Sequence, residues 1–120
     1  MDPFKVRQKR KPETLIQKKL VDFLRVRQWY VKEMHASLFL AGVPDLYICH
    51  KVYGARWVEV KILETGRYTP AQMDEFPRMA AAGAGIWVLV AATEEEYQKL
   101  FRGCNWLLFT ETFRQARSLG

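Results

Sequence analysis

Three charged residues of this chain have types and spacings suited to chemistry on a phosphate ester. Asp45 ends a Gly-Val-Pro-Asp turn before an apolar segment, and fourteen residues later Glu59 precedes Lys61 by two positions. Successive side chains of a strand point to opposite faces, so Glu59 and Lys61 are predicted to share one face. Two carboxylates and an ammonium on one hairpin can hold a hard divalent cation and stabilise charge beside it. The Glu-Val-Lys triplet alone is common on solvent-facing strands, but its combination with Asp45 indicates phosphodiester hydrolysis.

The first half of the chain is predicted to supply one helix and three strands that position these residues. A proline suits the first turn of the helix, and apolar side chains then recur at helical spacing. The second and third strands flank a short turn and form a hairpin, with Asp45 on one strand and Glu59 and Lys61 on the other. The predicted helix spans 12–28, and the predicted strands span 29–34, 45–50 and 56–63.

A capping box predicts the start of a second helix. Thr69 is a good N-cap residue, a proline follows it, and Gln72 stands at the third helical position. This helix should run to about Ala82, with a kink at Pro77, and Gly83 should end it.

The last third of the chain is predicted to add two strands around a third helix. The continuous apolar run 85–92 is typical of a strand buried on both faces. Thr93 and Glu96 predict a second capping box for a helix reaching about Phe101, and a short final strand is predicted over 105–110. The order α-β-β-β-α-β-α-β indicates an α/β fold, a mixed sheet flanked by helices.

Composition limits the classes to which the protein can belong. A chain of 120 residues with 49% hydrophobic residues suits one compact domain. Its beginning, 1–12, is basic and polar, unlike a secretory signal, and no apolar run is long enough for a membrane span. Cys49, Cys104, His35 and His50 have no partners at metal-ligand spacing, so zinc is not expected. We expect a reducing, cytoplasmic location.

Positive charge is concentrated at the beginning of the chain. Residues 1–32 carry a net charge of +7, whereas the remaining residues carry −1. We expect 1–11 to be a flexible basic arm ahead of a single domain over 12–120. A basic arm and a basic helix suit a phosphate backbone, although a solvated tail that aids solubility is the alternative. Candidate phosphate contacts are Lys9, Arg10, Lys11, Lys18, Lys19 and Arg67.

The motifs around the charged residues resemble those of a known nuclease family. Asp45 after a proline, followed by Glu59-Val60-Lys61, is similar to the PD-(D/E)xK signature, and the order α-β-β-β-α-β resembles the restriction-endonuclease-like core of that superfamily. More narrowly, the chain resembles the VRR-NUC family, in the small stand-alone form known from phages and bacteria. The resemblance covers roughly 12–92. Its motifs are PETLIQ with Glu13 and Gln17, GVPDL at 42–46, WVEVK at 57–61 and TGRYTPAQ at 65–72.

The resemblance implies a role for each matching residue. Asp45 and Glu59 would be ligands of Mg²⁺ or Mn²⁺, hard ions that prefer oxygen donors, and the backbone carbonyl of Val60 would be a third ligand. Lys61 would orient the attacking water or stabilise charge on the phosphate. Because two carboxylates neighbour it, we expect Lys61 to stay cationic and to act electrostatically rather than as a base.

Two further residues, Glu13 and Gln72, have both a functional and a structural interpretation. The resemblance brings Glu13 to the metal site, with Gln17 on the same helix face four residues later. Glu13 could instead simply favour the helix dipole from the first turn. Gln72 is explained by its capping box, and both roles are compatible if its amide also faces the site.

The four tryptophans, at positions 29, 57, 87 and 106, lie in predicted strands. We expect them in the core or an interface rather than as platforms for base stacking. Trp57 shares a strand face with Glu59 and Lys61 and is a candidate to line the site.

These observations together predict a metal-dependent, structure-selective DNA endonuclease of a bacterial or phage-infected cell. The domain is hardly larger than a catalytic core, so it should read the shape of branched DNA rather than a long base sequence. The resemblance implies a homodimer that resolves four-way (Holliday) junctions, with the apolar segment 105–113 as a candidate interface. The alternatives are a flap or nicking nuclease, a restriction-like nuclease, or a non-catalytic nucleic-acid binding module with the same fold.

Overall fold

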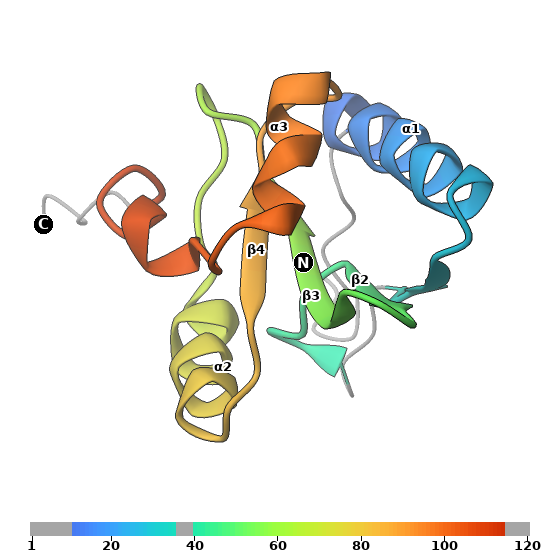
Figure 1. Ribbon diagram of the computed structural model, residues 1–120. Helices are drawn as coiled ribbons and strands as arrows, with labels where there is room; N and C mark the ends of the chain where they lie inside the picture. Colours follow the sequence, from blue (N-terminus) through green and yellow to red (C-terminus); the bar gives the residue numbers. More distant parts are fainter. Residues whose placement is uncertain (1–10, 36–39, 115–120) are drawn as a thin grey trace, which may run out of the picture.

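The computed structural model describes residues 11–35 and 40–114, which form three layers (Figure 1). A four-stranded sheet with the order β1-β2-β3-β4 lies in the middle. Helices α1 and α3 cover one face of the sheet, and α2 covers part of the other. The strands are β1 (Tyr30–Glu33), β2 (Leu46–His50), β3 (Gly54–Val60) and β4 (Ile86–Leu89). The helices are α1 (Lys11–Val26), α2 (Pro70–Ala81) and α3 (Glu94–Gln98).

The sheet is mixed, as the order of elements predicted. Strands β1, β2 and β3 are antiparallel, whereas β4 runs parallel to β3. The hairpin register pairs Leu46 with Val58. Continuing that register by one residue places Asp45 opposite Glu59, so the strand pairing itself brings the two predicted carboxylates together.

The face of the sheet beneath α1 forms the larger core. Leu46 and Ile48 of β2 and Val60 of β3 are fully buried there. They pack with Leu20 and Leu24, which share one face of α1 because they stand four residues apart. The alternating positions of the same strands, which include Asp45 and Glu59, therefore point to the face on which α2 lies.

The second core occupies only the β3–β4 half of the other face. Phe76 of α2 packs with Ile86 and Val88 of β4 and with Tyr68 and Phe113. All four residues of β4 are buried, which confirms the strand predicted to be covered on both faces. This core anchors α2 and the loop before it beside the end of β3.

The strand predicted over 105–110 is absent, and a 3₁₀ helix, η3 (Trp106–Phe109), takes its place. The side chain of Asn105 occupies the outer edge of β4: its Oδ1 accepts from the Val88 amide at 2.6 Å and its Nδ2 donates to the Val88 carbonyl at 3.1 Å. One side chain thus satisfies both backbone groups that a further strand would have paired. The chain then coils, burying Trp106 while Leu107 and Leu108 face outward.

The second predicted capping box is half correct. Thr93 Oγ1 accepts from the Glu96 amide at 3.2 Å, as an N-cap should. The Glu96 carboxylate does not return to the cap but accepts from the Val90 amide at 2.8 Å, just beyond β4. Helix α3 is correspondingly short and continues as a 3₁₀ helix, η2 (Lys99–Phe101). The hydrogen bond to the backbone amide of Val90, at the edge of the sheet, therefore forms in place of the second half of the capping box.

Several boundaries differ by a few residues from those predicted. Helix α1 includes Lys11, which was assigned to the arm, and ends before Gln28, whose φ of 70° is left-handed. Strand β3 ends at Val60, so Lys61 lies just beyond it. Of the tryptophans predicted in strands, Trp29 precedes β1 and Trp106 lies in η3; both are buried in the core.

Within the described ranges, no helix combines the length and the apolarity that crossing a membrane would require.

Candidate active site

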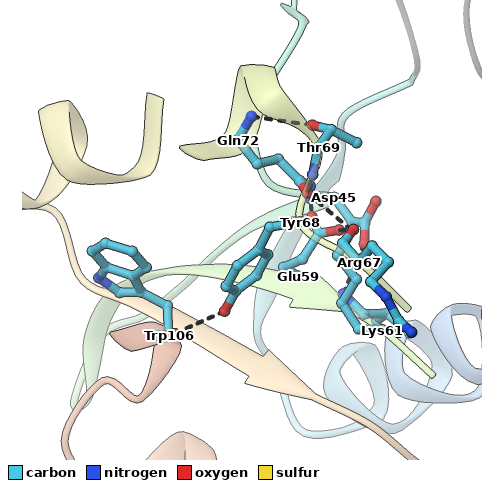
Figure 2. A network of polar contacts seen from close by, with 9 residues as sticks. Asp45, Glu59, Lys61, Arg67, Tyr68, Thr69, Gln72 and Trp106 are labelled. Carbon is cyan, nitrogen blue, oxygen red and sulfur yellow. Dashed lines mark hydrogen bonds and ion pairs between the residues drawn. The ribbon is translucent and has the colours of Figure 1, made fainter. Parts of the chain in front are cut away.

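Two hydrogen bonds join Asp45 to Glu59 and to Val60, at neighbouring ends of β2 and β3 (Figure 2). The Asp45 amide donates to Glu59 Oε1 at 3.1 Å, and the Val60 amide donates to Asp45 Oδ2 at 2.8 Å. Each carboxylate is therefore held by the backbone of the other strand. Glu59 is 2% exposed, and Asp45 is half-buried. Two acids held this close to each other, with one almost fully buried, both stay ionised only when positive charge lies nearby.

The ammonium of Lys61 supplies part of that charge and is held by three acceptors. Its Nζ lies 3.5 Å from Glu59 Oε2, and it donates to Gln72 Oε1 at 2.9 Å and to the Arg67 carbonyl at 2.7 Å. The side chain is buried. An ammonium has three protons and no acceptor, so this arrangement fixes its direction and favours the charged form.

Gln72 serves both the helix cap and the candidate site. The predicted capping box at the start of α2 is confirmed: Thr69 Oγ1 accepts from the Gln72 amide at 3.1 Å, and Gln72 Oε1 accepts from the Thr69 amide at 3.0 Å. The same Oε1 accepts a hydrogen bond from Lys61 Nζ. The N-terminus of α2 thereby fixes the lysine.

Two glycines allow the close approaches on which this geometry depends. The Gly66 amide donates to the Ile62 carbonyl at 2.6 Å, and a Cβ on Gly66 would lie 2.4 Å from that oxygen. This tight turn places the Arg67 carbonyl within hydrogen-bonding distance of Lys61 Nζ. Gly42, with a φ of 83°, lies against α2, and its Cβ would lie 2.4 Å from the Ala71 carbonyl. Both glycines stand in the motifs, but the sequence did not reveal these contacts.

Tyr68 forms a buried support beside the charged residues. Its hydroxyl donates to the Trp106 carbonyl at 2.7 Å, and Lys61 Nζ lies 5.9 Å from its ring centroid. Burial, and secondly the negative charge of Glu59, raise the pKa of Tyr68 well above the ordinary tyrosine value. Its position just ahead of α2 suggested from the sequence that Tyr68 could touch substrate, whereas the structure buries its side chain completely.

Tyr68 predicts a loss of stability in alkali. Because the folded state keeps the phenol neutral, its contribution is fully present below the ordinary tyrosine pKa of 10.0 and is lost as the pH rises above it. The Tyr68→Phe variant should lose about 1 kcal/mol at neutral pH with its hydrogen bond. Above pH 10 its unfolding free energy should fall less steeply than that of the wild type, by up to about 1.4 kcal/mol per pH unit. Urea unfolding at a series of pH values measures this, and parallel curves would contradict it.

The structure buries Glu13 in the first turn of α1. Only 5% of Glu13 is exposed, whereas its neighbours Pro12 and Thr14 are exposed. An acid that merely favours the helix dipole would not need to leave water, so the helix dipole alone does not account for this burial. Gln17, one turn later, is half-buried and donates to Glu33 Oε1 on β1 at 3.4 Å. Glu33 was not singled out from the sequence.

The predicted phosphate contacts lie mostly on the surface. Lys11, Lys18 and Lys19 are exposed on α1, and Arg67 is exposed beside the candidate site. Lys9 and Arg10 lie outside the described residues.

The oxygen donors at this site suit Mg²⁺ or Mn²⁺. Within 11–35 and 40–114, no group of three or more Asp, Glu, His or Cys side chains is placed to hold a metal ion, so the site itself offers the two carboxylates. Mg²⁺ is commonly held by one or two carboxylates, with water and substrate phosphate completing its shell. In a strand, the carbonyl and amide of one residue point the same way. The Val60 carbonyl should therefore face the Asp45 side, to which its amide donates.

Comparison with known proteins agrees with this architecture. A solved structure titled "VRR_NUC domain" superposes with a TM-score of 0.62 and 21% sequence identity, covering 78% of this chain and 98% of that one. No family model matches the sequence, and no curated protein matches it. The mixed sheet and its flanking helices correspond to a restriction-endonuclease-like core, and the chain has the fold of a VRR-NUC domain.

Proposed function

We propose that this protein is a metal-dependent, structure-selective DNA endonuclease that hydrolyses phosphodiester bonds. The observation that carries the proposal is that Asp45, Glu59 and Lys61 lie together at neighbouring ends of β2 and β3. Contacts of 2.7–3.5 Å hold them there. The similar structure titled "VRR_NUC domain" supports a nuclease of this type.

Asp45 and Glu59, with the Val60 carbonyl, would hold Mg²⁺ or Mn²⁺. Such an ion, when bound, lowers the pKa of its water and neutralises charge on the phosphate. Burial of Glu59 keeps bulk water from competing for the carboxylate oxygens, and the Val60 amide keeps the Asp45 carboxylate turned toward the site.

Lys61 would orient the attacking water and stabilise the negative charge that develops on the phosphate. Its three acceptors hold the ammonium in position before substrate arrives, so its positive charge is already in place for the reaction. The same acceptors favour the cation, which cannot remove a proton from water. Gln72 and the Arg67 carbonyl act as positioning groups for this charge.

Branched DNA is the proposed substrate. The described elements form one sheet with its covering helices, which supports recognition of DNA shape rather than of a long base sequence. Resolving a four-way junction requires two cuts, so we propose a homodimer with one site in each copy. Leu107 and Leu108, 67% and 81% exposed on η3, are candidates for the interface.

The exposed lysines of α1 should control the affinity for DNA. Reversing Lys18 and Lys19 to glutamate should weaken binding and reduce the slope of log affinity against log salt by about one for each phosphate that the variant no longer neutralises. Fluorescence anisotropy in EDTA at several salt concentrations measures both. Lys51→Glu, in the turn between β2 and β3, is the control. An equal change for each charge reversed in that variant would mean that only net charge matters.

Cleavage of a panel of DNAs tests the proposal. Four-way junctions, flaps and linear duplexes of equal base content are incubated with Mg²⁺ or with EDTA, and light scattering gives the oligomeric state. We expect paired cuts in the junction, only with the metal. Preferred cutting of the flap would instead favour the flap nuclease. Binding without any cleavage would favour a non-catalytic module.

A further inference from the structure

Three aromatic side chains form a row across the sheet on the face that carries Asp45 and Glu59. The ring centroids of Tyr30 and Tyr47 are 6.4 Å apart, and those of Tyr47 and Trp57 are 5.1 Å apart. Tyr47 and Trp57 are direct partners in the hairpin register, so they share a face. The row therefore runs from the edge strand β1 through β2 to β3.

The row lies one step from the candidate active site. Trp57 stands two residues before Glu59 on β3, and Tyr47 stands two residues after Asp45 on β2. Two residues along a strand span about 7 Å. A DNA strand with one phosphate at the two carboxylates could therefore place a neighbouring base over the aromatic row.

The row lies where the second core ends. Trp57 packs at the margin of the cluster formed by Phe76, Ile86 and Val88, whereas Tyr30 and Tyr47 belong to neither hydrophobic core of the described residues. Tyr30 is 60% exposed, and Tyr47 and Trp57 are half-buried. Helix α2 thus covers the β3–β4 half of this face, and the aromatic row continues from its margin onto the half formed by β1 and β2.

A positive charge stands within the row. Lys32 is exposed and is the direct partner of Tyr47 in the register of β1 with β2, so both project from the same face. Aromatic rings that accept stacked bases, combined with cations that follow the backbone, are the means by which proteins hold single-stranded nucleic acid. In a duplex the base faces are already stacked and cannot reach such rings.

We propose that Tyr30, Tyr47 and Trp57, with Lys32, bind unpaired nucleotides adjoining the phosphate that is cut. The inference rests on the proposed function, and it names the substrate feature that the site recognises: a single-stranded or unstacked segment at a branch. It also extends the expectation that Trp57 lines the site, and it gives this tryptophan the base-stacking role that was not expected of the four.

Binding measured in EDTA tests the row without cleavage. A fluorescent single-stranded oligonucleotide and a duplex of equal length are titrated with wild type and with Tyr30→Ala/Tyr47→Ala. The variant should bind the single strand about tenfold or more weakly and the duplex as before. Tyr30→Phe/Tyr47→Phe should bind like the wild type, because the rings remain. Trp57 is left unchanged because it also packs against the core.

Tyr53→Ala is the matched control. Tyr53 is 47% exposed and also contacts other rings, but it lies in the turn between β2 and β3, stacked on Trp29. Equal losses in Tyr53→Ala, or unchanged single-strand binding by the double alanine variant, would overturn the inference. Loss of self-association with intact single-strand binding would assign the row to a contact between two copies and would also overturn it.

The outcomes separate this inference from the proposed function. If the wild type cuts junctions while the alanine variant binds single strands normally, only the aromatic row is wrong. If the wild type cuts no DNA but single-strand binding still depends on the row, the nuclease proposal fails and the row stands.

Discussion

Replacing Asp45 with asparagine should reduce DNA cleavage by a factor on the order of 10³ while leaving the fold intact. Asparagine retains an oxygen that can accept from the Val60 amide, so the hydrogen bond that holds this position at 2.8 Å can persist. What disappears is the negative charge opposite Glu59, and with it one of the two carboxylates that would hold the metal. Initial rates in Mg²⁺, with thermal unfolding measured in parallel, check the expectation.

Glu96→Gln is the matched control for this variant. Glu96 is also a buried carboxylate that accepts from a strand-end amide, that of Val90 at 2.8 Å, but it belongs to α3. The control should cut DNA at the wild-type rate. Cleavage that survives Asp45→Asn, or that falls equally in both variants, would remove Asp45 from the catalytic machinery and leave it a structural role.

Replacing Lys61 with methionine should reduce cleavage by a factor on the order of 10³ and should also destabilise the protein. The ammonium proposed to stabilise charge on the phosphate is removed, and Glu59, only 2% exposed, loses the cationic partner that Lys61 supplies. Breaking a buried pair by deleting one partner costs about 3–5 kcal/mol in general. Because a divalent cation can take over as partner of Glu59, Mg²⁺ should raise the melting temperature of this variant more than that of the wild type.

Lys99→Met is the control for Lys61→Met. It distinguishes loss of the lysine at the candidate site from loss of a lysine–glutamate ion pair elsewhere in the protein. Lys99 pairs with Glu96 at 2.6 Å, a lysine–glutamate ion pair between η2 and α3 whose side chains are 26% and 11% exposed. Its removal should leave both cleavage and the response of the melting temperature to Mg²⁺ unchanged. If Mg²⁺ stabilises Lys61→Met no more than the wild type, then Glu59 and the metal do not interact as proposed.

Features set by neighbouring residues could be read from the sequence. The capping box of Thr69 and Gln72 involves bonds across three positions, and it forms as expected. The two-residue period of a strand placed Trp57 and Glu59 on one face. The helix of 12–28 and the hairpin were predicted within a few residues, because their hydrophobic spacing and turn chemistry are local.

Features that depend on contacts between different elements could not be predicted from the sequence. The apolar run 105–110 has the composition of a strand, but the edge of β4 that it would pair is already occupied by the side chain of Asn105. Glu96 has the position of a capping residue, but its carboxylate instead accepts a hydrogen bond from the Val90 amide, just beyond β4. In each case an unsatisfied backbone group elsewhere in the fold decided the outcome.

Residue types and local spacing specify which chemical groups this protein can bring to a reaction: two acids, a lysine and basic side chains, on elements of predictable type. That the two acids and the lysine meet depends on how the segments pack. The register of β2 against β3 sets Asp45 opposite Glu59, and the start of α2 aims the Gln72 oxygen at Lys61. Residue types and short periods are properties of neighbours along the chain, whereas register and convergence depend on packing between segments that only folding brings together.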